Sequence, residues 1–376
     1  MLIGVDAIHL CRSQKGIGRV ERSIIQTLSR RSHAHHFIVF LDRDHISLGL
    51  PVCPAITYAV ASAGSLLVWE QLQLPRLARR YQVDTLLSFS DRIPLALVGC
   101  VVLYLFEIPD YRREIALADE RVDVYQRASD TITRLLFPYS LKRAKRVVVA
   151  SRATDRDLRT RYHLPAWKIS VVPAAADSRF QPHPDILHRG MVRERFGAED
   201  GYVLHFSSGD LRENTPLALR AFGQAEIPPA MKMILVGSGA LEHESVSATV
   251  DALGLSERVL SLGHVSESDL VDLYQAADVY IDPSLFEGFG LQVLEAMACG
   301  VPVVCSNTTS LPEIVGDAAI TCDPNNVEAF ATGLEVILNN PGQAPAMRAA
   351  GLRQATRFSW QRTTGELVQL CERAAA

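Results

Sequence analysis

The fold is decided by the stretch Glu287-Gly288-Phe289-Gly290-Leu291-Gln292-Val293-Leu294-Glu295-Ala296-Met297-Ala298-Cys299-Gly300-Val301-Pro302-Val303-Val304. Gly288 and Gly290 allow a tight turn and a close approach of the backbone to a ligand. The helix predicted after them presents unpaired amides and the positive end of its dipole, which suits an anion. Gly300 ends the predicted helix, and residues 301–305 follow as a buried strand.

Helical spacing places Leu291, Leu294 and Ala298 on one core face of the predicted helix. Glu295 lies close to that apolar face, so its charge needs a partner. Glu295 and Glu287 bracket the turn and the helix. Taken alone, this strand, turn, helix and strand form a unit that many α/β proteins contain, and a single Gly-x-Gly pattern carries little information.

Length and composition limit the classes of protein to which the chain can belong. With 376 residues, the chain is long enough for two domains, each with its own core. A net charge of −4, from 38 Lys and Arg against 42 Asp and Glu, argues against nucleic acid as the general partner. The seven Cys are scattered without Cys-x-x-Cys spacing, so we expect buried thiols in a reducing compartment and no metal site.

The N-terminal residues read as a strand and not as a secretion signal, so the protein is expected in the cytosol. The longest apolar run, residues 93–106, is interrupted by Pro94 and Gly99 and is shorter than the ~18 residues that a spanning helix needs. Four basic residues near the end of a predicted helix over residues 124–144 leave two interpretations open. They complement the helix C-terminus, or they favour contact with an anionic membrane surface from the cytoplasmic side.

Both halves of the chain alternate predicted strands and helices. The first half has predicted strands over residues 2–6, 36–40, 55–59, 85–88, 101–105, 147–150 and 168–173. A proline-rich linker over residues 174–184 follows, and the second half has predicted strands over residues 202–206, 232–236, 259–262, 279–282 and 301–305. This rhythm predicts an α/β fold with a doubly wound, mostly parallel sheet in each half.

Two segments of the first half are candidate ligand contacts. Gly16 and Gly18 open an amphipathic helix, and such a turn admits a phosphate or a sugar but equally serves as a plain connection. Glu107 and Asp110 come directly after the predicted strand over residues 101–105, at the edge where open α/β sheets bind ligands. They are acceptor-binding groups or merely solubilise the loop.

Taken in order, the motifs resemble those of the retaining GT-B glycosyltransferases of the family 4-like, group 1 type, and of a mannosyltransferase-like subgroup in particular. In the first half these motifs are Gly16-Ile17-Gly18-Arg19, Trp69-Glu70-Gln71 with Leu74-Pro75, and Ser151-Arg152-Ala153-Thr154. In the second half they are Arg212-Glu213-Asn214, Val236-Gly237-Ser238-Gly239, Pro283-Ser284, the opening stretch, Leu311-Pro312-Glu313-Ile314-Val315-Gly316-Asp317 and Phe358-Ser359-Trp360. The resemblance covers nearly the whole chain.

The resemblance implies a GT-B architecture of two Rossmann-like domains with an interdomain cleft. The expected parts are an acceptor-side domain over residues 1–173, a nucleotide-sugar-binding domain over residues 174–355 and a helix over residues 356–376 that returns to the first domain. The implied reaction is a retaining transfer of a hexose from a nucleotide-diphosphate sugar, GDP-mannose being favoured, to a glycan, a lipid-linked saccharide or a small molecule, as in polysaccharide biosynthesis.

The resemblance also assigns roles to residues. Glu287 would hold hydroxyls of the donor sugar, and Glu295 would accept both ribose hydroxyls, a task that suits the two acceptor oxygens of a carboxylate. The amides of Phe289, Gly290 and Leu291 would contact the sugar and the phosphate. No cofactor is expected, and no metal either, since no Asp-x-Asp motif for a divalent metal is evident.

The departing diphosphate is negatively charged, so the site needs preorganised donors. Backbone amides at Gly290, Gly16 and Gly18 can supply some of them, and Arg212 can supply a fixed positive charge. Ser208 stands in the turn after the first strand of the second half, where the family usually carries an Arg.

The sequence departs from the family pattern at two further places. Glu213 stands where the family has a Lys, and Phe106-Glu107 stands where the family often has His-Asp. Glu107 is therefore expected to bind the acceptor, as a second candidate catalytic residue. Retaining transfer needs no protein base at this point, because the leaving phosphate can take the proton of the acceptor. The same departures motivate an alternative, a non-catalytic accessory protein that binds a sugar nucleotide.

Overall fold

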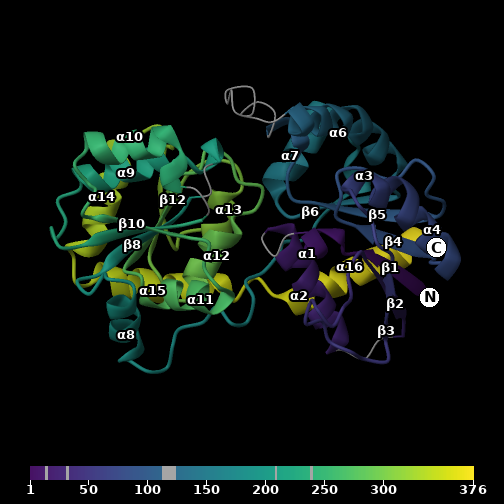
Figure 1. Cartoon of the computed structure of the whole chain (residues 1–376), viewed down its shortest axis with the longest axis horizontal. Helices are drawn as coiled ribbons and strands as arrows, with labels where there is room; N and C mark the ends of the chain where they lie inside the picture. Colours follow the sequence, from purple (N-terminus) through teal and green to yellow (C-terminus); the bar gives the residue numbers. More distant parts are fainter. Residues whose placement is uncertain (13–15, 31–33, 112–123, 208–209, 238–239) are drawn as a thin grey trace. The chain divides into compact units, whose positions relative to one another are not determined.

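The protein is described by a computed structural model over residues 1–12, 16–30, 34–111, 124–207, 210–237 and 240–376 (Figure 1). The chain divides into two compact units. The first unit combines Met1–Ala174 with Ser359–Ala376, and the second is Ala175–Phe358. Each unit contains one sheet of parallel strands, so the predicted α/β fold with two doubly wound sheets is confirmed.

The first unit has a seven-stranded sheet in the order β3-β2-β1-β4-β5-β6-β7. Its strands are β1 (Leu2–Asp6), β2 (His36–Leu41), β3 (Ile56–Val60), β4 (Thr85–Ser88), β5 (Cys100–Leu105), β6 (Arg146–Val149) and β7 (Ile169–Val171). All the pairings are parallel. The strand order reverses between β1 and β4, which is the point where open α/β sheets bind ligands.

The helices of the first unit connect these strands. They are α1 (Ile8–Arg12), α2 (Ile17–Ser29), α3 (Leu66–Val68), the π-helical turn η1 (Trp69–Gln73), α4 (Leu74–Tyr81), α6 (Val124–Arg143), α7 (Arg152–Tyr162), η2 (Ala166–Lys168) and α16 (Trp360–Ala375). The C-terminal helix α16 packs against α2, β4 and β5. The Thr85 hydroxyl donates to the Cys371 carbonyl at 3.1 Å, which ties α16 to β4.

The second unit has a six-stranded sheet in the order β10-β9-β8-β11-β12-β13. Its strands are β8 (Tyr202–Phe206), β9 (Lys232–Val236), β10 (Val259–Gly263), β11 (Val279–Asp282), β12 (Val303–Ser306) and β13 (Ile320–Cys322). These pairings are also parallel. Here the order reverses between β8 and β11, so residues at the ends of these two strands are placed where a ligand is expected.

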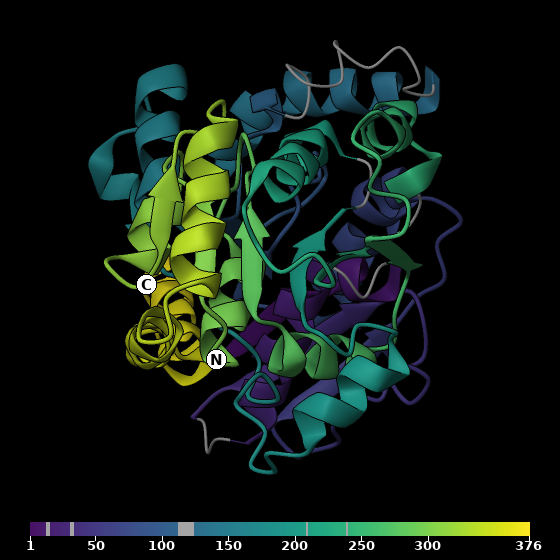
Figure 2. The same ribbon diagram turned by 90° about the vertical axis from the view of Figure 1, so that its left-hand side faces the viewer.

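Helices cover both faces of this second sheet. They are α8 (His188–Arg195), η3 (Leu211–Glu213), α9 (Thr215–Gln224), η4 (Ala240–Glu242), α10 (Glu244–Ala252), α11 (Glu267–Ala276), α12 (Leu291–Ala298), α13 (Leu311–Val315), α14 (Val327–Leu338) and α15 (Gln343–Ala355). Figure 1 shows α9, α10 and α14 on one face and α11, α12 and α15 on the other, in agreement with their contacts. The same layers can be followed after a 90° turn (Figure 2).

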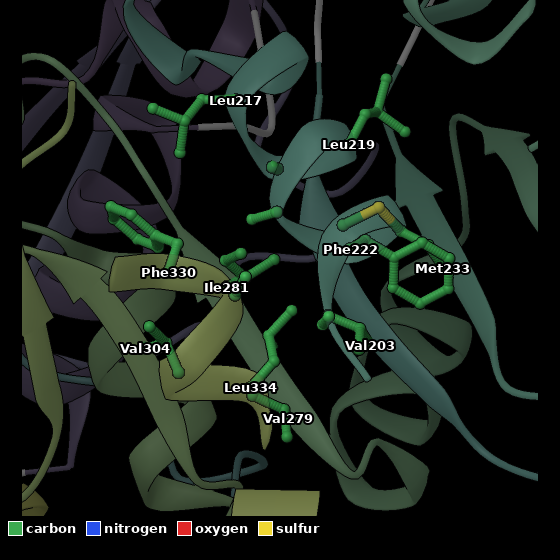
Figure 3. Packing of buried hydrophobic residues seen from close by; sticks show 14 of the residues in the cluster. Val203, Leu217, Leu219, Phe222, Met233, Val279, Ile281, Val304, Phe330 and Leu334 are labelled. Carbon is green, nitrogen blue, oxygen red and sulfur yellow. The ribbon is translucent and has the colours of Figure 1, made fainter. Parts of the chain in front are cut away.

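The core of the second unit lies between its sheet and the layer of α9 and α14. Figure 3 shows Phe222 of α9 and Phe330 and Leu334 of α14 facing the strand residues Val203, Met233, Val279, Ile281 and Val304. These side chains are almost fully buried. Because this packing fixes β8, β11 and β12, it also fixes the loops that follow them.

Candidate functional site

The loop between β11 and α12 makes a tight turn at Gly290. Gly290 precedes α12 and has a φ of +89°, in the left-handed region. A Cβ on Gly290 would lie 2.6 Å from Leu311 Cδ2. At the other end, Gly300 follows the helix with a φ of +75°. The predicted glycine turn and the predicted helix end are confirmed, and the Leu291 amide lies at the N-terminus of an eight-residue helix.

Glu295 lies within α12 and is only 1% exposed. The predicted core face was wrong in part, because Leu291 and Ala298 are only half-buried. Because α12 packs against β11 and β12 and also against α11, α13 and α15, its buried residues do not follow one face. They are Val293, Leu294, Glu295, Ala296 and Met297. Burial raises the pKa of the neighbouring Cys299 thiol, and the charge of Glu295 raises it further.

Glu287 is half-buried, and its main chain is bonded on both sides. Its amide donates to Thr309 Oγ1 at 3.1 Å, and its carbonyl oxygen accepts from Ser310 Oγ at 2.8 Å. Sequence reasoning missed both partners, whose only signal was their place directly before Leu311-Pro312-Glu313. The loop between β12 and α13 therefore sets the conformation of Glu287.

Arg212 lies in η3 and is paired with Asp210. The Nη2 and Nε atoms of Arg212 lie 2.6 Å and 2.9 Å from Asp210 Oδ2. The Arg212 carbonyl oxygen accepts from the Leu285 amide at 2.8 Å. Arg212 is thus brought to the turn that carries Glu287, with Asp210 offsetting part of its charge. Ser208, the other residue predicted near this position, lies outside the described residues.

A buried carboxyl group ends β11 beside this turn. Asp282 Oδ1 accepts from the Ser284 hydroxyl at 2.5 Å and from the Ser284 amide at 3.2 Å. Tyr280 donates its hydroxyl to Asp282 Oδ2 at 3.5 Å. Burial raises the pKa of Asp282. The sequence marked this residue only as the end of a strand, although it anchors the start of the loop to Glu287.

A buried histidine lies at the end of β8, next to β11. His205 Nδ1 lies 3.0 Å from the Ile281 carbonyl oxygen and His205 Nε2 lies 3.0 Å from Thr215 Oγ1. Because a carbonyl only accepts, Nδ1 carries the proton. Burial lowers the pKa of His205 to about 4, so the imidazole is neutral near pH 7. Sequence reasoning missed His205, since a single His inside a strand gives no pattern.

The glycine turn of the first unit is present as predicted. Gly16 is the residue before α2, with a φ of +49° and no atom of the described residues within 4 Å of where a Cβ would be. Gly18 is buried within the first turn of α2. The turn into the helix is confirmed, while its contact with a phosphate stays a prediction.

Glu107 is half-buried in the segment after β5. The Phe106 carbonyl oxygen accepts from Thr154 Oγ1 at 2.9 Å, which fastens this segment to the start of α7. Asp110 accepts from the Tyr162 hydroxyl of the same helix. Asp110 therefore holds the segment against α7, and Glu107 stays the candidate for binding the acceptor.

A buried polar cluster occupies the reversal point between β1 and β4. The Trp69 indole donates to Asp6 Oδ1 at 3.0 Å. Arg92 Nε lies 3.0 Å from Glu70 Oε2, and the Ser90 hydroxyl donates to Glu70 Oε1 at 3.2 Å. Burial raises the pKa of Asp6 to about 7 and also raises that of Glu70. Trp69-Glu70 was predicted only as part of a motif, and its role in this cluster was missed.

The described residues offer neither a metal-binding cluster nor a membrane-spanning helix. Within the described ranges, no three or more His, Cys, Asp or Glu side chains gather in a way that could hold a metal ion. The helices of the same ranges include none with the length and apolar character needed to cross a bilayer. Transfer without a metal stays a prediction.

Two family models match the chain. The model of glycosyl transferases group 1 matches residues 192–354, and that of glycosyltransferase family 4 matches residues 15–180. O-antigen chain mannosyltransferase B of Escherichia coli is 34% identical over 231 residues, which are 61% of this chain and 61% of that protein. An MMP alpha-(1->4)-mannosyltransferase of Mycolicibacterium hassiacum is 30% identical, over 61% of this chain and 54% of that protein. The matches thus span about half to three fifths of these relatives.

Solved structures show the same fold. Sucrose-phosphate synthase from Thermosynechococcus elongatus has a TM-score of 0.79 at 19% identity, covering 99% of this chain and 98% of that one. HepE from Anabaena, in complex with UDP and glucose, has a TM-score of 0.77 at 18% identity and covers 99% of both chains. Both identities are low, so these neighbours establish the GT-B fold alone.

Proposed function

The chain belongs to the GT-B glycosyltransferases of group 1, and from this premise we propose that it is a retaining hexosyltransferase that uses a nucleotide-diphosphate sugar. The observation that carries the proposal is the turn at Gly290, with Glu287 before it and the buried Glu295 in the helix behind it. GDP-mannose is favoured as the donor because several relatives at 30% identity and above are named mannosyltransferases, although others are named D-inositol 3-phosphate glycosyltransferases. A UDP-sugar is the competing candidate for the donor, because one structural neighbour was solved with UDP and glucose.

In this proposal the second unit binds the donor. Glu295 accepts the ribose hydroxyls, and Glu287 holds hydroxyls of the sugar. The amides of Phe289, Gly290 and Leu291 bind the phosphates and the sugar at the positive end of α12.

The diphosphate is bound largely by backbone donors in this proposal. The guanidinium of Arg212 is already paired with Asp210, so its positive charge is partly offset. Ser208 takes the place of the family's usual Arg, and a hydroxyl offers hydrogen bonds but no charge. The helix N-terminus at Leu291 therefore supplies more of the binding than in relatives that have the Arg.

The reaction breaks the bond between the anomeric carbon and the diphosphate oxygen and forms a bond from that carbon to the acceptor oxygen. The acceptor's proton passes to the departing phosphate. Preorganised donors at the diphosphate stabilise the charge that develops there. In the first unit, Gly16 and Gly18 offer backbone near a phosphate and Glu107 binds an acceptor hydroxyl. The acceptor is a glycan, a lipid-linked saccharide or a small molecule.

The proposal is tested by incubating the protein with GDP-mannose, UDP-glucose, UDP-galactose and GDP-fucose and a panel of saccharide acceptors, followed by measurement of nucleotide release and product mass. We expect one donor to be consumed, with a product heavier by one hexose. A donor that binds and is transferred to none of the acceptors would contradict the proposal and favour the accessory protein. That alternative is not favoured, because the matching relatives are named as transferases.

We further propose that the first unit contacts an anionic membrane surface from the cytoplasmic side. Large apolar side chains are exposed on three neighbouring segments: Leu67, Val68 and Leu72 of α3 and η1, Leu95 and Val98 after β4, and Ile132, Leu135 and Tyr139 of α6. Hydrogen bonds link these segments, because the Leu95 amide donates to Gln71 Oε1 and the Ile93 amide donates to Ser140 Oγ. Exposed apolar side chains that gather on linked segments are typical of an interaction site.

Charge supports a bilayer as the occupant of this apolar surface. Exposed basic residues lie on the same helices and beside them: Arg76, Arg79, Arg80, Arg134, Lys142 and Lys145. Each basic residue near an anionic leaflet contributes about 1 kcal/mol to binding.

Sedimentation with vesicles tests this contact. Vesicles that contain phosphatidylglycerol should retain the protein at low salt, whereas phosphatidylcholine alone should not. Leu95→Ser with Val98→Ser should weaken the retention. The control Ile186→Ser removes an exposed apolar side chain from the second unit and should not. Equal retention of all variants would contradict the proposal.

A further inference from the structure

The loop between β12 and α13 interlocks with the turn that carries Glu287. Thr309 Oγ1 accepts from the Glu287 amide at 3.1 Å, and Ser310 Oγ donates to the Glu287 carbonyl at 2.8 Å. Leu311 fills the space beside Gly290. Side chains of one loop thus satisfy both main-chain groups of Glu287, and the two peptide planes that set the direction of its Cα–Cβ bond are fixed.

Thr309 holds an unfavourable backbone conformation to make this contact. Its φ is +53°, and a β-branched residue in this region is a genuine outlier. The other described non-glycine residues with positive φ are Gln82, His163 and Asn214, and each of these ends a helical turn, where such a conformation is common. Thr309 follows no helix and lies in the turn before α13, which is closed by the Leu311 amide and the Thr308 carbonyl at 3.3 Å. Glycine, asparagine and aspartate usually occupy the positive-φ position of such a turn, so a threonine there is an exception. Strain of this kind gathers at functional sites.

Ser310 also departs from the behaviour that is usual at its position, because its side chain does not cap α13. It is the residue before α13, a position where a serine hydroxyl normally accepts from an amide of the first helical turn. Its side chain makes no such bond and donates to the Glu287 carbonyl instead. Two adjacent residues therefore break a local preference for the same target, and such coincident exceptions are expected at functional sites.

The neighbouring residue Thr308 also carries a hydroxyl, and this hydroxyl does not bond to the Glu287 turn. Thr308 Oγ1 is buried and has no hydrogen-bond partner among the described residues. The Thr308 hydroxyl therefore does not help to hold the Glu287 turn, whereas that of Thr309 does. The pair Thr308 and Thr309 gives a matched comparison of a hydroxyl that bonds to the Glu287 turn with one that does not.

We propose that Thr309 and Ser310 are positioning residues that hold the Glu287 main chain, so that its carboxylate is aligned before the donor sugar arrives. This role rests on the proposed function of Glu287. It predicts that losing the Thr309 hydroxyl affects binding of the sugar part of the donor and leaves binding of the nucleotide part, which Glu295 is proposed to hold, unchanged.

The test compares Thr309→Val, Thr309→Ser and Thr308→Val in the full chain. The Val variant keeps the branched shape but leaves the Glu287 amide without its acceptor, so affinity for GDP-mannose and kcat/KM should fall about tenfold. The affinity for GDP should stay within about twofold of the wild-type value, since the loss of a hydrogen bond at Glu287 leaves the contacts of the nucleotide intact. Thr309→Ser keeps the hydroxyl and should retain most of the activity, and Thr308→Val should behave as the wild type.

Two further measurements separate positioning from general structure. In a Glu287→Ala background, Thr309→Val should no longer weaken GDP-mannose binding, because the two residues act as one unit. Amide hydrogen exchange at position 287, measured without any ligand, should be faster in Thr309→Val than in the wild type.

Three results would overturn the role: equal losses of GDP and GDP-mannose affinity, equal effects of Thr308→Val and Thr309→Val, or unchanged exchange at position 287. A wild type that binds none of the donor panel would overturn the proposed function together with this role. If the wild type binds a donor and Thr309→Val binds it with the same affinity, the positioning role alone would be overturned.

Discussion

A methyl group of Leu311 occupies the place where a side chain on Gly290 would begin. A Cβ on Gly290 would lie 2.6 Å from Leu311 Cδ2, a distance that real Cβ atoms do not show. Leu311 is fully buried, so it has little room to move aside. Since Gly290 also has a positive φ, sterics and backbone conformation both exclude a side chain at the start of α12.

Gly290→Ala should therefore destabilise the second unit and reduce transfer. The combined strain and overlap should lower the free energy of unfolding by about 1–3 kcal/mol. Urea denaturation measures this change. Gly342→Ala is the matched control, because Gly342 also precedes a helix but has a φ of −84° and no atom near its missing Cβ. Equal stabilities of the two variants would show that the Leu311 contact is not restrictive.

Glu295→Ala and Glu287→Ala should have different effects on binding and transfer. Loss of the Glu295 carboxylate removes hydrogen bonds to the ribose, so GDP should bind about ten- to a hundredfold more weakly. Glu287→Ala should reduce transfer more than it reduces GDP affinity, because its contacts are with the sugar. Calorimetric titration and initial rates measure the two effects, with the exposed Glu328→Ala as control. Similar, negligible effects of both variants would refute these assignments.

Breaking the buried pair of Glu70 and Arg92 should be costly. Both side chains are almost fully buried, and Arg92→Met leaves the Glu70 carboxylate without the guanidinium. The free energy of unfolding should fall by about 3–5 kcal/mol. The more exposed pair of Arg159 and Asp155 on α7 is the control, since Arg159→Met should cost less than about 1 kcal/mol. Denaturant unfolding that gives similar losses for both variants would contradict a special role for the buried pair.

The buried Asp6 should make stability depend on pH. Burial raises its pKa to about 7, whereas the unfolded chain has an ordinary Asp with a pKa of about 3.9, so the folded state binds more protons between these values. The contribution of Asp6 to stability is therefore present at low pH and is lost as the pH rises through about 7.

Asp6→Asn mimics the protonated form and removes this dependence. Relative to the wild type, the variant should gain about 2–3 kcal/mol of stability between pH 5 and pH 8. The groups that face Asp6 are Trp69, Ser88, Glu70 and Glu21, and they are the same in both proteins. Urea titrations at the two pH values measure the change. A constant difference between variant and wild type would contradict a raised pKa.

Local patterns were sufficient for much of the fold. Alternating segments of strand and helix character predicted the parallel strands of the described residues except β13, and Gly16 was correctly predicted to open a helix. The helix α8 was missed, because it is held in place by Arg189 and Arg193, which pair with Asp278. Those partners are more than eighty residues away in sequence, and no local pattern reveals them.

The candidate site was predictable to a similar degree. Glu287, Gly290 and Glu295 stood in a recognisable motif, whereas Thr309 and Ser310 come from another loop and have ordinary side chains. Their importance arises from a positive φ and a missing helix cap, which only the folded chain shows. The predicted face of α12 failed for a related reason, since contacts with several other elements, which no local pattern shows, decide which of its residues are buried.

The anomeric configuration of the transferred sugar tests the central claim most directly. GDP-α-mannose would be supplied with the saccharide acceptor identified in the donor panel, and the new linkage would be assigned by nuclear magnetic resonance from its one-bond carbon–proton coupling. We predict an α-linked mannose, formed much more slowly by Glu287→Ala. A β-linked product, or transfer that is unaffected by Glu287→Ala, would contradict the account.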